Sequence, residues 1–385
     1  MKTYILRRLL LMIPTLFGIT MVVYFIVRLA PGDPVEAMIR NQAGNLDPKV
    51  MKADTEKIRQ RLGLVDYHFL RDRFYGAPAS PQDEPKTFAY KAVLAGDNLA
   101  SAAIGYVGWM KKVAHRDFGE SIQYRGRPAL DLIIERIPVT VTLNVFADTL
   151  IFGLAIPIGL AAARRQGRWF DVTSSLTVLV LYSVPPILAG TLLLGYLGLG
   201  GQGLEWFPLV GLHSFGYEKL SFYDHAWGLI LHPSWPAACA LYDYLKDLLW
   251  HVALPVVCLV YGGLAYMAKM GRASLLENLR ADYVRTARAK GLPEGRVIYH
   301  HALRNSLLPM ITIMVLTVPA LLGGSVVVES IFSIQGTGLL LVGAAQTYDL
   351  AVLMAETLLY GVLTLGFLLI GDVLYAWADP RVRYE

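Results

Sequence analysis

The stretch ADYVRTARAKGLPEGRVIYHHALRNSLLPMIT, residues Ala281 to Thr312, lies between two apolar runs that are each long enough to cross a bilayer. It is basic and rich in residues that favour helix. Gly291 can turn the chain through positive φ at the end of a first helix, and Pro293 suits the first turn of a second helix. The stretch therefore predicts a helix, a glycine break and another helix, held against one face of the membrane.

The first half of this stretch combines small side chains with cations. The small residues are Ala281, Thr286, Ala287 and Ala289, and the cations are Arg285, Arg288 and Lys290. A helix surface of small residues allows the backbone of a partner to come close, and cations beside spans favour the cytoplasmic side. The pattern predicts a docking element, and the alternative is a solvated basic loop between two spans.

The composition of the whole chain is typical of a polytopic membrane protein. Of 385 residues, 55% are hydrophobic and 17% are charged, with a formal net charge of +5. Cys239 lies in a polar loop and Cys258 in an apolar run, which argues against a disulfide or a metal site. The sequence contains no CxxC, HExxH, GxSxG or phosphate-binding loop pattern. We therefore expect no catalytic, cofactor or metal site in this chain, and no nucleic acid partner.

Six apolar runs predict an all-α membrane protein with six transmembrane helices, since about 20 residues suffice for one span. We expect these spans at about residues 9–30, 138–163, 171–198, 251–269, 306–328 and 350–377. The first run is longer than the apolar core of a secretory signal, about 7–15 residues, so we expect it to remain uncleaved. Pro185 and Pro186 interrupt the third span, because proline removes a helical hydrogen bond and bends the helix.

Basic clusters alternate with loops that hold few cations. The turn at residues 164–171 carries three arginines, the loop at 199–250 carries few cations, and the carboxy-terminal ADPRVRYE carries Arg381 and Arg383. The positive-inside rule then places both termini in the cytoplasm. We divide the chain into a tail and first helix at 1–30, an extracytoplasmic segment at 31–137 and a five-helix core at 138–385, with a docking loop at 273–305.

The string RTARAKG, with Leu308-Pro309 after it, resembles the EAA loop of ABC importer permeases in the form found in dipeptide and oligopeptide permeases. Arg285-Thr286-Ala287 stands where that family has Glu-Ala-Ala, so the leading Glu is missing, whereas Ala287 and Gly291 match. Further strings resemble the same family: RRLLLMIPTLFGIT, APGDP, LGLVDY, RDFGESIQYRGRP, WFPLVGL, VVVESIFSIQGTG and DPRVRYE. Residues 76–106 look like an insertion in this pattern, which we expect to be a surface embellishment; a contact surface for a solute receptor is the alternative for residues 31–137 as a whole.

This resemblance implies the type I importer fold and one transmembrane subunit of an ATP-driven peptide importer in the bacterial cytoplasmic (inner) membrane. The implied partners are membrane lipid, a second permease, an extracytoplasmic solute-binding protein and two ABC ATPase subunits that hold ATP and magnesium. The resemblance assigns ATPase coupling to Asp282, Tyr283, Arg285, Thr286, Ala287, Ala289, Lys290 and Gly291.

Ionisable side chains in apolar runs are costly unless they face a bundle interior, a partner or water. One hypothesis is that Asp148 or Glu356 lines the pathway and meets a peptide ammonium; the alternative is a polar contact at a subunit interface or a group near the membrane boundary. Ser325, after Gly323-Gly324, suggests close helix packing beside the pathway.

Snorkelling accounts for Arg28, Lys269, Glu329 and Asp372, which lie near span ends. His300 and His301 are adjacent and point in different directions on a helix, so they predict no metal face.

Three alternatives remain open. A permease of the same family could serve glutathione, a nickel chelate or a peptide antibiotic. A proton-coupled secondary carrier could use Asp148, Glu356 or Asp372, although internal repeats, common in such carriers, are not evident. A membrane-embedded hydrolase would need a nucleophile–base motif, which the sequence does not show.

Overall fold

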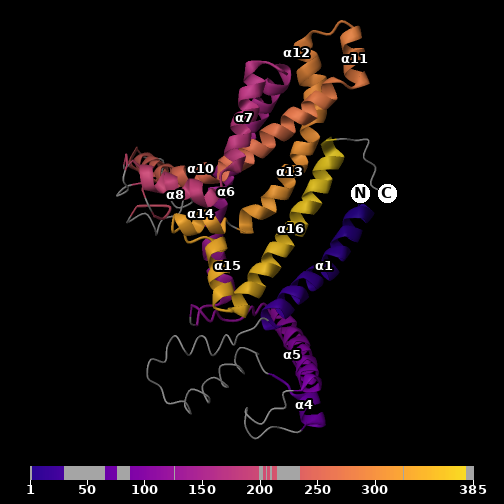
Figure 1. Cartoon of the computed structure of the whole chain (residues 1–385), viewed down its shortest axis with the longest axis vertical. Helices are drawn as coiled ribbons and strands as arrows, with labels where there is room; N and C mark the ends of the chain where they lie inside the picture. The colour runs from indigo at the N-terminus through magenta and orange to yellow at the C-terminus, as the bar shows by residue number, and fades with distance from the viewer. Residues whose placement is uncertain are drawn as a thin grey trace. The chain divides into compact units, whose positions relative to one another are not determined.

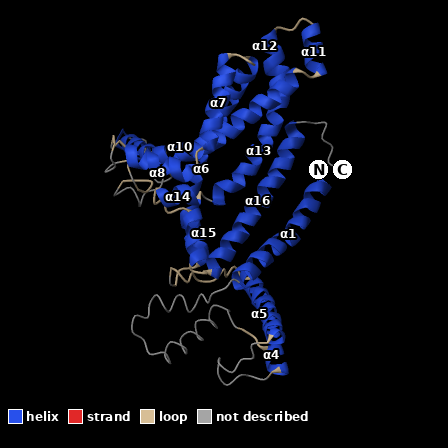
Figure 2. Ribbon diagram, in the orientation of Figure 1, coloured by secondary structure: helices blue, strands red, loops and turns tan. Residues whose placement is uncertain are grey.

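A computed structural model of the chain describes residues 2–29, 66–75, 87–124, 126–198, 203–204, 206–208, 210–214, 235–323 and 325–378 (Figure 1). These residues form helices joined by loops, with no β-strand among them (Figure 2). The all-α fold class is therefore confirmed. The strings APGDP and DPRVRYE lie outside the described residues.

The helices group into two compact units, which we describe one at a time. Unit 1 comprises Met1–Glu135 and Leu340–Leu365, and unit 2 comprises Arg136–Leu339 and Gly366–Glu385. This division cuts across the three segments expected from the sequence, whose boundaries stay a prediction.

In unit 1, helix α1 (Lys2–Leu29) packs on helix α5 (Phe88–Ala114). The Tyr106 hydroxyl donates to the carbonyl oxygen of Phe17 at 3.0 Å and lies 2.8 Å from the Thr20 hydroxyl. Buried apolar side chains of α5 join Tyr24 in the same core. Of the 76–106 segment, the part that lies in α5 therefore contributes buried residues such as Tyr90, Ala102 and Tyr106 to unit 1; its status as an insertion and as a surface embellishment stays a prediction.

Two buried carboxylates anchor the loops of unit 1. Asp97 on α5 accepts the backbone N–H groups of Leu70 and Arg71 at 2.8 and 2.9 Å, which caps helix α4 (Phe69–Phe74). Asp349, just before helix α16 (Leu350–Ala378), accepts the backbone N–H of Ile122 at 2.8 Å and the Ser121 hydroxyl. The loop that carries RDFGESIQYRGRP is thereby fixed to the start of α16.

In unit 2, helices α6 (Ala129–Arg164) and α10 (Trp235–Leu279) approach closely at Gly159. A Cβ at Gly159 would lie 2.8 Å from the carbonyl oxygen of Ala268, so a side chain there would separate the two backbones. Both helices are longer than the spans expected at 138–163 and 251–269. Hydropathy marks the membrane-crossing part of a helix and not its polar ends, which explains the difference.

The third expected span is broken, as its two prolines predict. Helix α7 (Trp169–Ser183) and helix α8 (Pro186–Leu197) meet at an angle of 92° (Figure 1). The Tyr261 hydroxyl of α10 donates to the carbonyl oxygen of Val184 at 2.8 Å. A neighbouring helix therefore satisfies a carbonyl group at the bend.

The fifth expected span, 306–328, ends earlier than predicted. Helix α13 (Leu303–Gly323) stops before Ser325, and the short helix α14 (Val326–Ile331) follows. Glu329 on α14 is 1% exposed, so snorkelling is wrong for this residue. Its carboxylate accepts the Thr140 hydroxyl at 3.1 Å and the backbone N–H of Leu339 at 2.8 Å, and such donors offset the cost of burial. These bonds tie α14 to α6 and to helix α15 (Thr337–Gln346).

Among the described residues, four helices are long and apolar enough to cross a membrane, or five if α7 and α8 form one bent span. The four segments are Tyr4–Leu29, Ala129–Arg164, Ala238–Leu279 and Leu350–Val373. Multiple spans are thus confirmed. The count of six, which needs α13, stays a prediction.

Candidate coupling site

The docking stretch folds as a helix, a break and a second helical segment, as predicted. Helix α11 (Asp282–Ala289) leads into helix α12 (Glu294–Arg296), a six-residue π-helix at Val297–Ala302, and then α13. Pro293 precedes α12 and does not lie in its first turn. In Figure 1, α11 and α12 lie at the end of unit 2 where α7 begins.

Helix α11 has one buried face and one exposed face. Val284 and Ala287 are 0% and 5% exposed, and they pack in an apolar cluster with Leu275, Val297 and Ala302. The outward side chains are those of Asp282, Tyr283, Arg285, Thr286, Ala289 and Lys290. The cluster fixes α11 on α10 and on the π-helix, so that its polar face points away from the protein.

The burial of Ala287 corrects one expectation. We expected Ala287 to belong to the small-residue surface that a partner approaches, but its side chain packs against this chain itself. On α11 a residue every third or fourth position shares a face, so Val284 and Ala287 form the inner side. Of the expected small residues of α11, Thr286 and Ala289 remain exposed.

Gly291 ends α11 with a closed hydrogen-bond pattern. Its φ is +77°, a left-handed conformation that glycine adopts without steric cost. The N–H of Gly291 donates to the carbonyl oxygen of Arg288 at 2.9 Å, and that of Leu292 donates to Ala287 at 3.4 Å. These two bonds are the Schellman motif, and Leu292 adds its apolar contact by packing on the Ala287 cluster.

An ion pair braces the break from the other side. The Arg288 guanidinium donates to Glu294 at 2.6 and 3.2 Å, across the turn from α11 to α12. This hydrogen bonding lowers the pKa of Glu294 below its usual value and raises the pKa of Arg288. Arg288 also donates to the carbonyl oxygen of Leu279 at 3.4 Å, near the end of α10. One side chain therefore links three helices.

Further contacts orient the exposed face of α11. The Tyr283 hydroxyl donates to the Asn278 side chain at 2.6 Å, and the Thr286 hydroxyl donates to the carbonyl oxygen of Asp282 at 2.9 Å. Arg285 and Asp282 lie 3.3 Å apart, but their side chains are 72% and 96% exposed. An exposed pair of this kind contributes little stability. Asp282 and Arg285 are thus available to a partner.

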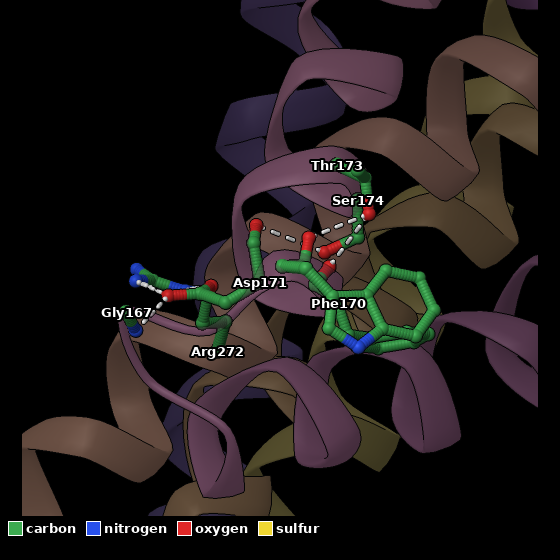
Figure 3. Close-up of polar contacts among 7 residues, drawn as sticks. Gly167, Phe170, Asp171, Thr173, Ser174 and Arg272 are labelled. Carbon is green, nitrogen blue, oxygen red and sulfur yellow. Dashed lines mark hydrogen bonds and ion pairs between the residues drawn. The ribbon is translucent and has the colours of Figure 1, made fainter.

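A second ion pair lies at the basic turn at 164–168 and holds Gly167 of that turn (Figure 3). Asp171, in the first turn of α7, accepts two hydrogen bonds from Arg272 of α10, one of them at 2.8 Å, and one from the N–H of Gly167 at 3.0 Å. The Asp171 side chain is 5% exposed. Because a buried carboxylate needs such partners, the pair fixes α7 on α10.

The three pathway candidates lie on separate elements. Asp148 is a half-buried residue of α6, Ser325 lies between α13 and α14, and both belong to unit 2. Glu356 is a buried residue of α16 in unit 1. Their assignment to a pathway stays a prediction. His300 is exposed and His301 half-buried in the π-helix, and no group of metal-binding side chains occurs among the described residues.

Sequence reasoning missed the residues that hold this site together. Asp171 and Arg272 are 101 positions apart, and no local signal connects them. Arg288 and Glu294 are six apart, a spacing that falls outside the helical pairing rule because a turn intervenes. A search for charges that flank a Gly-x-Pro turn would have found the second pair.

Comparison with known proteins gives a consistent result. A family model described as binding-protein-dependent transport system inner membrane component matches residues 155–384. The oligopeptide transport system permease protein AppB of Bacillus subtilis (strain 168) is 33% identical over 384 residues, covering 100% of both chains. The dipeptide transport system permease protein DppB of Alkalihalophilus pseudofirmus is 31% identical over 394 residues, covering 100% of both chains. The glutathione transport system permease protein GsiC of Escherichia coli O6:H1 is 32% identical over 385 residues, also covering 100% of both chains.

Proposed function

The chain belongs to the family of binding-protein-dependent transport system inner membrane components, and on that premise we propose that it is a permease subunit for dipeptides or oligopeptides. It would form half of a translocation pathway and take its energy from ATP hydrolysed by other subunits. The names of AppB and DppB support peptides as the substrate class. Family membership argues against the two alternatives from other classes, a proton-coupled carrier and a membrane hydrolase.

The assembly we propose contains a second permease, two ATPase subunits that hold ATP and magnesium, and an extracytoplasmic solute-binding protein. The membrane is the bacterial cytoplasmic membrane, with both termini and α11 on the cytoplasmic side. The three arginines of the 164–168 turn and the cations of α11 support this orientation.

The outward polar face of α11 is the observation that carries the coupling proposal. A short helix transmits force well when it cannot rotate or unwind against its own protein. The buried Val284 and Ala287 prevent rotation, and the Gly291 turn with the Arg288–Glu294 pair closes the end of the helix. Closure of the ATPases would therefore move α11 and α10 together and rock the spans.

Because Ala287 is buried, the coupling face is tested at Ala289, which is exposed. Ala287→Trp would disturb the fold, whereas Ala289→Trp places a bulky group on the exposed face at little cost to stability. The chain is purified with its ATPase subunits and reconstituted in proteoliposomes, and copurified ATPase and ATP-driven peptide uptake are measured. We expect Ala289→Trp to lower both by about ten-fold or more, equivalent to about 1.4 kcal/mol.

The matched control is Arg296→Trp, an exposed residue of the same loop outside the coupling face. It should retain ATPase subunits and uptake near the wild-type level. Wild-type capture of ATPase by Ala289→Trp would overturn the assignment of α11. Loss of both activities in the control would show that the effect is not specific to this face.

Glutathione is the second candidate substrate, because GsiC is 32% identical to this chain over its whole length. Uptake of labelled dipeptide, oligopeptide and glutathione by the same proteoliposomes, supplied with the cognate binding protein, separates the two. Competition by glutathione but not by peptides would favour this second candidate.

A further inference from the structure

A cavity of about 590 Å³ lies between α6, α7 and α10, entirely within unit 2. It is distinct from the exposed face of α11. Its wall includes Leu179 and Tyr182, residues that are 59% and 66% exposed, so the cavity opens on the surface of the subunit. A surface groove on a membrane-spanning helix group faces lipid or another chain.

The lining changes character along the groove. Ser174, Lys269 and Arg272 lie at the end next to the basic turn, since Arg272 bonds to Asp171 in the first turn of α7. One to two turns further along the same helices, the wall is mostly apolar, with Leu179 and Ala265 beside Tyr182 and Tyr266. The groove therefore has one cationic end and one apolar end.

Lys269 is the cation at this end that remains available. The Arg272 guanidinium is occupied by Asp171. Lys269 is exposed, and within the described part of the chain no carboxylate pairs with it. Arg164, Arg165 and Arg168 of the adjoining turn raise the positive potential around it.

We propose that this groove binds an anionic phospholipid, with the head-group phosphate at Lys269 and an acyl chain along the apolar wall. The charge and the polarity of the groove both match such a molecule. A peptide in the same groove would bury amide groups against a wall with few hydrogen-bonding partners, which is costly. An acyl chain needs no such partners, and a cation near the membrane surface attracts anionic lipid by about 1 kcal/mol.

The test uses the full-length purified chain in nanodiscs and a phosphatidylglycerol probe that carries a diazirine in its acyl chain. After irradiation, the cross-linked peptides are identified by mass spectrometry. We expect labelling of the α7 and α10 segments that line the groove. Excess phosphatidylglycerol should suppress this labelling, whereas phosphatidylcholine and inorganic phosphate should not.

Two variants remove the two halves of the site. Lys269→Ala should lower labelling about five-fold, the change that corresponds to about 1 kcal/mol, and Lys269→Arg should restore it. Ser175→Trp should lower it by filling the groove from an exposed position. The matched controls are Lys246→Ala, an exposed lysine about 35 Å away on α10 at about 1.5 Å per residue, and Thr177→Trp, an exposed residue of α7 outside the groove wall.

Three results would overturn the proposal. The first is equal labelling by anionic and zwitterionic probes, and the second is unchanged labelling in Lys269→Ala. The third is protection of the groove by a transported peptide or by a second permease but not by phosphatidylglycerol. The proposal does not depend on the peptide substrate, because lipid binding is measured without transport.

Discussion

Two of the helix breaks in unit 2 are built differently. At Gly291 the chain turns through positive φ, and the backbone groups at the end of α11 are satisfied by the Schellman bonds of the turn itself. At Pro185-Pro186 the chain bends by 92°, and the carbonyl oxygen of Val184 depends on Tyr261 of another helix. The glycine break is closed within a few residues, whereas the proline break relies on α10.

This difference indicates how each break responds when neighbouring helices shift. A turn that satisfies its own backbone stays the same when neighbouring helices shift, which suits an element that transmits force. A bend held by a neighbour changes when that neighbour shifts, because its hydrogen bonds cross between helices. We therefore expect substitutions on α10 to affect the α7–α8 bend more than any single change affects the α11 turn.

The largest effect should come from Arg272→Ala, which removes the tie between α10 and the start of α7. The nearly buried Asp171 would keep the N–H of Gly167 as its remaining described donor, and a stranded buried charge costs about 3 kcal/mol. Denaturant unfolding in detergent measures the change. Arg280→Ala, an exposed arginine near the end of the same helix, should stay close to wild type. Equal unfolding midpoints for the two variants would refute the structural role of the pair.

The next effect should come from Tyr261→Phe, which removes the donor to the Val184 carbonyl oxygen. A carbonyl left without a partner away from water costs about 2 kcal/mol. Hydrogen exchange measured by mass spectrometry should show faster exchange in α7 and α8. Tyr266→Phe, on an exposed tyrosine of α10, is the control and should leave exchange unchanged. Similar exchange in both variants would mean that the bend does not need its neighbour.

A smaller effect is expected for Gly291→Ala. A Cβ there would meet no heavy atom within 4 Å, so the cost is that of a left-handed residue alone, about 1 kcal/mol. Gly291→Asn should cost less, because Asn tolerates this conformation better. Gly295→Ala, which also has open space but is not among the glycines with positive φ, is the control. Thermal unfolding should show Gly291→Ala as the most destabilised of the three variants, Gly291→Asn as the next and Gly295→Ala as the least.

The smallest effect on stability should come from lowering the pH, which protonates Glu294. Hydrogen bonding to Arg288 lowers the pKa of Glu294 in the folded protein, so the pair stabilises at pH values above the usual pKa of 4.5. The contribution is lost as the pH falls through the lowered value. Both side chains are about half exposed, so solvent limits the effect to about 0.5 kcal/mol. Unfolding of wild type and Glu294→Gln should differ at pH 7 and converge at low pH; a constant difference would contradict the pairing.

Both breaks could be predicted from the sequence because their causes are local. Gly291 followed by Pro293, and the pair Pro185-Pro186, restrict the backbone whatever the surroundings. The apolar runs also predicted the long helices, because an apolar run of about 20 residues indicates a membrane span. The ends of α6 and α10 were missed because their polar turns lie outside the apolar run.

The contacts that position the candidate site could not be predicted. Burial of Ala287 depends on where Leu275 and Val297 lie in the folded chain, and an alanine looks the same on either face of a helix. Burial of Glu329 depends on Thr140, which is 189 residues away. Snorkelling was the reasonable interpretation of a carboxylate near a span end, and it failed because donors from α6 and α15 surround this one.

The π-helix at Val297–Ala302 has a consequence for the register of the chain. A π turn holds one residue more than an α turn, and each helical residue accounts for about 100° of rotation. The side chains of α13 are therefore offset by one step from the positions that a continuous α-helix starting at α12 would give them. A one-residue deletion between Val297 and Ala302 would regularise the turn and leave the stripe of side chains that α13 presents to its neighbours unchanged, whereas conversion of the turn to α geometry without a deletion would rotate the whole of α13 by one step.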